Sequence, residues 1–121
     1  MNKVLHLLFV VVVGGCVTPV IPLPPPNPSL MSLTADTNKG EIVISGKASD
    51  PHSDALYYFY NLRTGYGTIA LAQPDGSFTT QPLEAKDGDK LDLWTSRFGE
   101  DEPSSVVRVI VRYSGSLERT D

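Results

Sequence analysis

From about residue 30 to residue 113, apolar and polar residues alternate in short runs that are separated by turn residues. In Val107 to Arg112, three valines lie on one side of an extended chain and two arginines on the other. No window repeats with the helical period. Pro74-Asp75-Gly76 and Asp87-Gly88 are typical of turns between strands. The predicted strands are 29–35, 41–46, 56–61, 68–73, 77–82, 90–97 and 105–113.

About seven short strands at this spacing predict an all-β fold, a single antiparallel β-sandwich over residues 30–113. The chain has 121 residues, which is enough for one domain. Its polar end, residues 114–121, shows no alternation and is predicted to be a disordered tail.

The start of the chain follows another pattern. Lys3 precedes an apolar run over residues 4–13, which matches the core of a secretory signal peptide and is short for a bilayer span. The stretch Val13-Gly14-Gly15-Cys16 resembles the bacterial lipobox. This resemblance implies that residues 1–15 are a lipoprotein signal peptide and that Cys16, the only cysteine, carries the lipid. The alternative is a buried strand or helix with a core cysteine.

Proline dominates the stretch after Cys16. Six of the ten residues from 19 to 28 are proline, which cannot donate a backbone hydrogen bond. We therefore predict an extended polyproline linker over residues 16–29 that holds the domain away from the membrane. The alternative is a ligand for a proline-binding domain.

Four short segments resemble, in their order and spacing, bacterial immunoglobulin-like and carboxypeptidase-regulatory-like modules. They are Ile44-Ser45-Gly46, Asn61-Leu62-Arg63-Thr64-Gly65, Asp75-Gly76-Ser77-Phe78 and Gly88-Asp89-Lys90-Leu91-Asp92-Leu93. The resemblance covers residues 30–113 and implies an immunoglobulin-like β-sandwich without catalysis. It also implies that Phe59 faces the core, and with it Tyr57.

The two-residue period then assigns the other side chains of these strands to faces. Because the third, sixth and seventh strands of such a sandwich lie in one sheet, five outward side chains are predicted to share its outer face. They are Tyr58, Tyr60, Trp94, Arg108 and Arg112. These residue types dominate binding hot spots, so the face is predicted to bind a partner. The alternative is a set of cross-strand pairs that stabilises an exposed sheet.

Charge and reactive side chains argue against several functions. The formal net charge of −4 argues against a nucleic-acid partner and a polybasic membrane contact. Asp50-Pro51-His52-Ser53-Asp54 holds triad residue types, but neighbours on one loop rarely converge as a triad. We therefore predict no catalytic residues, no cofactor and no His/Cys metal site. Calcium at loop aspartates stays open, at Asp50, Asp54, Asp75, Asp87, Asp89 and Asp101.

Together these features predict a lipid-anchored protein of the cell envelope that binds or supports a partner and is not an enzyme. Its predicted partners are the membrane, through Cys16, and an envelope protein. Val17 replaces the aspartate that resembles an inner-membrane retention signal, which favours the outer membrane in a Gram-negative cell. Two alternatives remain. One is a pilotin-like or accessory assembly lipoprotein of a secretion or motility machine; the other is a glycan-binding module that stacks sugars on Tyr58, Tyr60 and Trp94.

Overall fold

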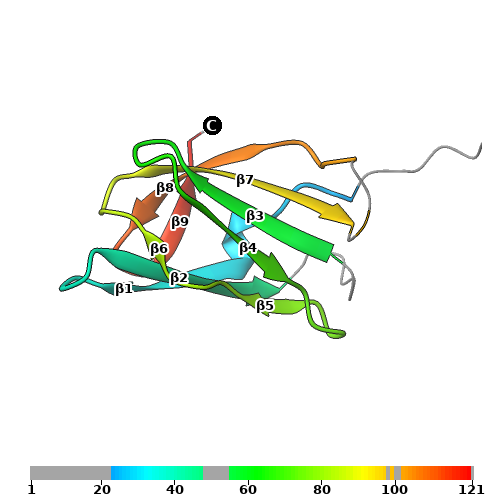
Figure 1. Cartoon of the computed structure of the whole chain (residues 1–121), viewed down its shortest axis with the longest axis horizontal. Coiled ribbons are helices and arrows are strands. Elements are labelled where there is room, and N and C mark those ends of the chain that lie inside the picture. The colour runs from blue at the N-terminus through cyan, green and yellow to red at the C-terminus, as the bar shows by residue number, and fades with distance from the viewer. Residues whose placement is uncertain (1–22, 48–54, 98, 100–101, 121) are drawn as a thin grey trace, which may run out of the picture.

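A computed structural model describes residues 23–47, 55–97, 99 and 102–120 as two antiparallel sheets packed face to face (Figure 1). The four-stranded sheet contains β1 (Met31–Asp36), β2 (Glu41–Lys47), β5 (Ser77–Thr79) and β6 (Leu83–Glu84). The five-stranded sheet runs in the order β4 (Gly67–Leu71), β3 (Ala55–Asn61), β7 (Lys90–Arg97), β8 (Val107–Arg112), β9 (Ser116–Arg119). The predicted all-β sandwich is confirmed, with β3, β7 and β8 in one sheet.

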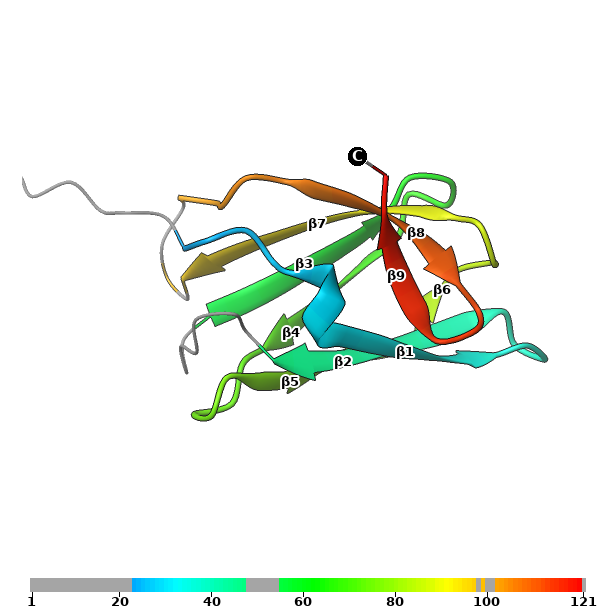
Figure 2. The ribbon, with the colours of Figure 1, turned by 180° about the vertical axis from the view of Figure 1, so that it is seen from behind.

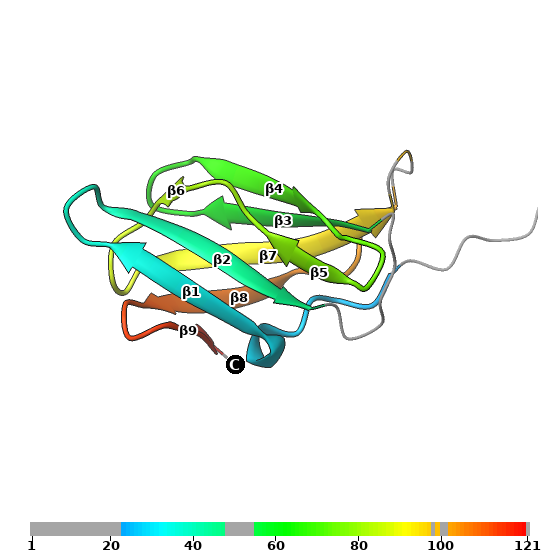
Figure 3. The ribbon, with the colours of Figure 1, turned by 90° about the horizontal axis from the view of Figure 1, so that it is seen from below.

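The core lies between the two layers, which Figure 3 shows one behind the other. The faces that the resemblance and the two-residue period together assigned on β3 are correct: Tyr57 and Phe59 are buried, while Tyr58 and Tyr60 point away from the core. Tyr57 stacks on Phe78 of the opposite sheet, with ring centroids 4.3 Å apart. The side chains that are fully buried come from both sheets: Phe59, Ile42, Ile44, Leu91, Leu93, Val109, Val111, Asn61 and Thr95.

The strand predicted over 77–82 ends early. Only residues 77–79 are in a strand, β5, and the separate two-residue β6 begins just after the predicted segment; both pair with β2. The turn at Pro74-Asp75-Gly76 therefore joins β4 in one sheet to β5 in the other, instead of two strands of one hairpin. The turn residues were recognised, but the partner of each strand depends on contacts distant in sequence.

The prediction of a disordered tail over 114–121 is wrong for the part that the structure describes. Residues 116–119 form β9, which pairs with β8 from Val109↔Arg119 to Arg112↔Ser116. Only Leu117 of this strand is buried, so its alternation is too short to stand out in the sequence. The turn before β9 also links the sheets, because the Leu33 amide donates to the Gly115 carbonyl at 3.0 Å.

The predicted spacer over 16–29 is wrong for residues 23–28, which pack on the sandwich. Leu23, Pro26 and Pro28 are buried, and the Thr95 hydroxyl donates to the Pro24 carbonyl at 3.0 Å. The segment ends in the short 3-10 helix η1 (Pro28–Leu30), which lies beside β9 and β1 (Figure 2). A polyproline chain has three residues per turn, so Leu23 and Pro26 share a face that apolar packing can bury.

Several predictions fall outside the described residues. They are the signal peptide 1–15, Cys16, the 17–22 part of the linker, His52 with its neighbours Asp50, Ser53 and Asp54, and Asp101. Within the described residues, no helix has the length and apolar character needed to cross a membrane.

Candidate functional site: the outer face of the five-stranded sheet

Strand register brings the predicted aromatic residues together on the outer face of the five-stranded sheet. Tyr58 of β3 lies directly opposite Trp94 of β7 on one side and Ile69 of β4 on the other. The Tyr58 and Trp94 rings stack with centroids 5.3 Å apart and planes 4° apart. Tyr60 lies two residues further along β3, opposite Asp92 and Gly67. The three predicted aromatics therefore share one surface.

A shallow hollow of about 220 Å³ opens on this surface. Its lining is almost wholly apolar and comes from Tyr58, Phe59, Tyr60, Gly67, Thr68, Ile69 and Trp94. Two β4 side chains extend the apolar surface toward the edge of the sheet: Ile69 is 54% exposed and Leu71 is 50% exposed. The sequence interpretation missed both. Their signal was present, because they alternate with Ala70 and Ala72, which are buried.

The two predicted arginines lie on the same face but are engaged in cross-strand ion pairs. Arg108 binds Asp92 through two hydrogen bonds, of 2.7 and 3.1 Å. The hydrogen bond to Asp92 raises the pKa of Arg108 above that of a free arginine. Arg112 pairs with Glu118 of β9 at 2.8 Å. Both arginines are therefore paired with carboxylates of neighbouring strands. The face divides into an apolar half over β4, β3 and the Trp94 part of β7, and an ionic half that runs from Asp92 of β7 over β8 to β9.

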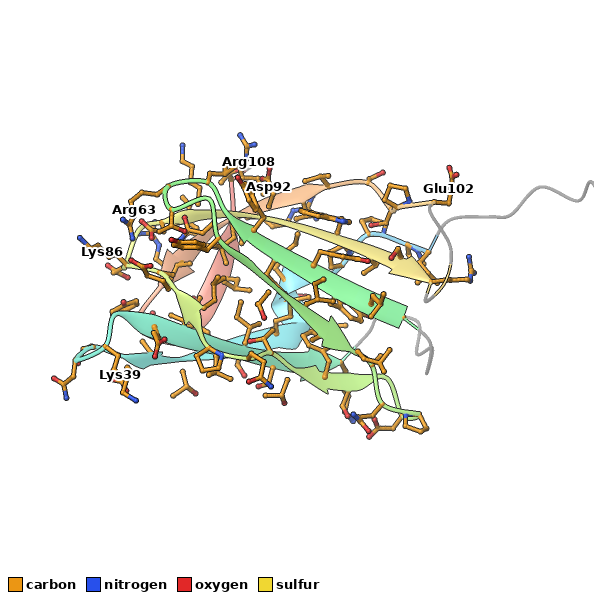
Figure 4. All side chains as sticks on the ribbon, in the orientation of Figure 1. Lys39, Arg63, Lys86, Asp92, Glu102 and Arg108 are labelled. Atoms are coloured by element: carbon orange, nitrogen blue, oxygen red, sulfur yellow. The ribbon has the colours of Figure 1, made fainter. Side chains whose placement is uncertain are left out.

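Two larger hollows lie elsewhere and have mixed polar linings. One, of about 450 Å³, lies on the four-stranded sheet between Thr34 and Glu41. The other, of about 330 Å³, lies beside the Asp92–Arg108 pair. Figure 4 shows Asp92 and Arg108 together on the outer side of the five-stranded sheet, with Lys39 on the opposite side of the molecule. The apolar hollow is the one that the predicted aromatics line.

A polar network that the sequence interpretation missed closes one end of the sandwich. The fully buried Asn61 side chain donates to the Asp89 carboxylate at 3.0 Å and to the Glu84 carbonyl at 3.1 Å. The Arg63 guanidinium donates to both oxygens of Asp89, at 2.8 and 3.0 Å, and the Lys86 amide donates to it at 2.8 Å. Burial alone would raise the pKa of Asp89, but these hydrogen bonds outweigh burial and lower it. The network joins the loops that follow β3 and β6.

The loop aspartates that the structure describes are engaged by donors of the chain. Asp75 accepts from the Ser77 amide and hydroxyl, and Asp87 accepts from the Tyr113 amide at 2.7 Å. Asp89 belongs to the network above. Within residues 23–47, 55–97, 99 and 102–120, no group of three or more His, Cys, Asp or Glu side chains is placed to hold a metal ion.

The arrangement is suited to binding. It combines half-buried aromatic rings, exposed aliphatic side chains and a rim of paired charges, which is the composition of a protein–protein contact surface. Comparisons with protein-family models, with curated proteins and with solved structures found no match to this chain. Its function is therefore argued from the sequence and from this face.

Proposed function

We propose that the protein is a lipid-anchored, non-catalytic module of the cell envelope that binds an envelope protein through the apolar half of its outer face. The observation that carries the binding is the uncharged apolar surface made by Ile69, Leu71, Tyr60 and the Tyr58–Trp94 stack. The anchor rests on the signal-like residues 1–15 and on Cys16. An outer-membrane location rests on Val17 alone.

The geometry of the rings favours a protein partner over a glycan. A sugar stacks on an open ring face, and the stack of Tyr58 on Trp94, at a 5.3 Å separation, leaves at most one face of each ring for such a contact. Aliphatic side chains such as Ile69 and Leu71 suit the core of a protein contact, and the Asp92–Arg108 pair suits its polar rim. A structural module of immunoglobulin-like type would have the same sandwich, with β3, β7 and β8 in one sheet.

The proposed lipid anchor predicts that substitution of Cys16 abolishes both lipid labelling and membrane association. Cys16→Ser is expected to abolish labelling of the chain with radioactive palmitate and to release it from the membrane fraction, because serine lacks the thiol that takes the lipid. Val17→Ser, which keeps the thiol, serves as the control and should retain both label and membrane association. An unlabelled parent chain, or a Cys16→Ser chain that is labelled like the parent, contradicts the anchor.

The binding face predicts a crosslink that depends on position. A photo-crosslinking amino acid at Tyr60, which is exposed beside the hollow, is expected to yield a discrete adduct with a second protein in intact cells. The same amino acid at Val43, on the outer side of the four-stranded sheet, is the control and should yield no such adduct. Equal adducts at both positions, or none at either, would count against a binding face.

The identity of the crosslinked protein separates this proposal from the assembly-factor alternative. A component of a secretion or motility machine in the adduct, identified by mass spectrometry, would assign the chain to that machine. Retention of the intact parent chain on immobilised envelope glycans, lost on substitution of Trp94, would support the glycan alternative instead.

A further inference from the structure

The β4 strand forms an open edge of the five-stranded sheet. It pairs with β3, and none of the other described strands pairs with it. The Asn61 amide donates to the Tyr66 carbonyl, and the Ala72 amide donates to the Ala55 carbonyl. Because hydrogen-bonding direction alternates along an antiparallel strand, the even residues 66–72 face β3. The backbone groups of Gly67, Ile69 and Leu71 therefore point away from the sheet.

The other edges carry features that block strand addition, and β4 carries none. β9 has charged residues at 118 and 119 and lies beside η1, and β1 is tied to the turn before β9 through the Leu33–Gly115 hydrogen bond. β5 and β6 have only three and two residues. Natural sheets protect their edges with charge, proline, cover or short length. The sequence from 64 to 73 contains no charged residue and no proline.

We propose that β4 pairs antiparallel with β4 of a second copy of this chain, about a twofold axis at Ile69. Such an interface is self-complementary, since each residue meets the same partner on both copies. In this register Ile69 faces Ile69, and Gly67 of each copy faces Leu71 of the other. The two five-stranded sheets then form one continuous sheet with the aromatic stacks of both copies on the same side.

Side-chain sizes fit this register. Gly67 leaves space beside Tyr60, in the hollow of about 220 Å³, and a side chain on Gly67 would collide with the Phe59 carbonyl at 2.8 Å. Leu71, half exposed on the same face, projects from the strand at the position that meets this hollow in the second copy. In the dimer, Leu71 of each copy therefore packs beside Gly67 of the other copy, and the two Ile69 side chains pack against each other at the twofold axis.

Charge favours a second copy as the occupant. Like charges directly opposite each other across an antiparallel pair are destabilising, and a twofold axis brings each central residue against itself. The chain carries a formal charge of −4, yet the β4 edge, the one long edge without protection among the described strands, is neutral over residues 64–73. Pairing of β4 with an extended peptide of another protein is the alternative, which the crosslinking experiment distinguishes.

Cysteine crosslinking tests the register in the full chain in its own membrane. Ile69→Cys should form a disulfide-linked dimer under mild oxidation, because opposed residues of antiparallel strands lie within disulfide reach. Val106→Cys is the matched control, since Val106 is 58% exposed on the same side of the sheet but beside β8, far from the edge. The parent chain, which retains Cys16, reports any crosslink through that thiol. Equal crosslinking of all three chains would overturn the proposal.

A charge substitution provides the second test. The full parent chain in mild detergent should have the protein mass of a dimer, and Ile69→Lys should halve that mass, because two lysines would face each other. Val106→Lys should leave the dimer intact. A monomeric parent chain, or a dimer that Ile69→Lys does not weaken, would overturn the proposal. A crosslink from position 69 to a different protein assigns the edge to a foreign peptide and also overturns it. The palmitate-labelling test of the proposed function stands apart from these results. An adduct from position 60 supports the proposed function only when mass spectrometry identifies a protein other than a second copy of this chain, because the dimer also brings Leu71 of the second copy to the hollow beside Tyr60.

Discussion

Replacing Asp89 with alanine is expected to lower the free energy of unfolding by about 3 kcal/mol. The substitution removes the acceptor of the buried Asn61 side chain and of the Lys86 amide. Each donor that is left buried without a partner costs about 1–3 kcal/mol. Arg63 is half exposed and can return to water, so its lost pair adds less. Urea unfolding followed by the fluorescence of Trp94, the only tryptophan, measures the loss.

Asp92→Ala provides the matched control. Asp92 also binds an arginine through two hydrogen bonds, but this pair lies on the outer face of the sheet, with Arg108 51% exposed. Surface pairs contribute less than about 1 kcal/mol, so Asp92→Ala should change stability little. If the two alanine variants lose equal stability, the Asp89 network does not hold this end of the sandwich together.

The Asp89 network should also make the free energy of unfolding depend on pH in the acid range. Because the pKa of Asp89 is lowered in the folded chain, the unfolded chain binds a proton first as the pH falls. The stabilisation is therefore complete above about pH 4 and is lost as the pH falls below that value, toward the folded pKa. In Asp89→Asn, the free energy of unfolding should fall less steeply as the pH is lowered through this range. Asp75, whose pKa is lowered chiefly by its hydrogen bond with Ser77, is retained in both chains, so their difference isolates Asp89.

Leu23→Ala is expected to cost about 2–4 kcal/mol, a typical loss for a buried leucine. Leu23 is only 5% exposed, next to the Pro24 carbonyl that accepts the hydrogen bond from Thr95. Leu30→Ala is the control within the same segment, because Leu30 is 45% exposed and should lose less than about 0.5 kcal/mol. The same fluorescence measurement applies. Equal small losses in both variants would mean that the proline-rich segment acts only as a spacer.

The faces of the central strands were predictable because one side of each strand is buried. On β8 the three valines alternate with polar or partly exposed residues, and a shift by one residue would put arginine in the core. A shared outer face for Tyr58 and Trp94 was also predicted, from the two-residue period and from the resemblance, which assigns β3 and β7 to one sheet. Their direct opposition depends on the strand register, which was not predicted. The faces follow from local pattern and one topological rule.

The features that were missed depend on contacts between distant segments. Proline content predicts an extended chain at residues 23–28 but does not say what that chain packs against. The network around Asp89 joins residues from 61 to 89, and nothing near Asp89 in the sequence indicates that Arg63 pairs with it. The exposed Ile69 and Leu71 were missed because no faces were assigned on the predicted strand 68–73, which carries no charged residue to mark its outer side.

The docking of Leu23 near the end of β7 has a consequence for how two anchored copies would meet a bilayer. Only seven residue steps separate Cys16 from Leu23, so the tether reaches at most about 25 Å. Antiparallel pairing through β4 sends the two tethers out at opposite ends of the joined sheet. If Cys16 carries the proposed lipid, both anchors lie at the same height when the twofold axis stands along the membrane normal. The joined sheet would then lie parallel to the membrane, with both Tyr58–Trp94 stacks facing the same way relative to the bilayer.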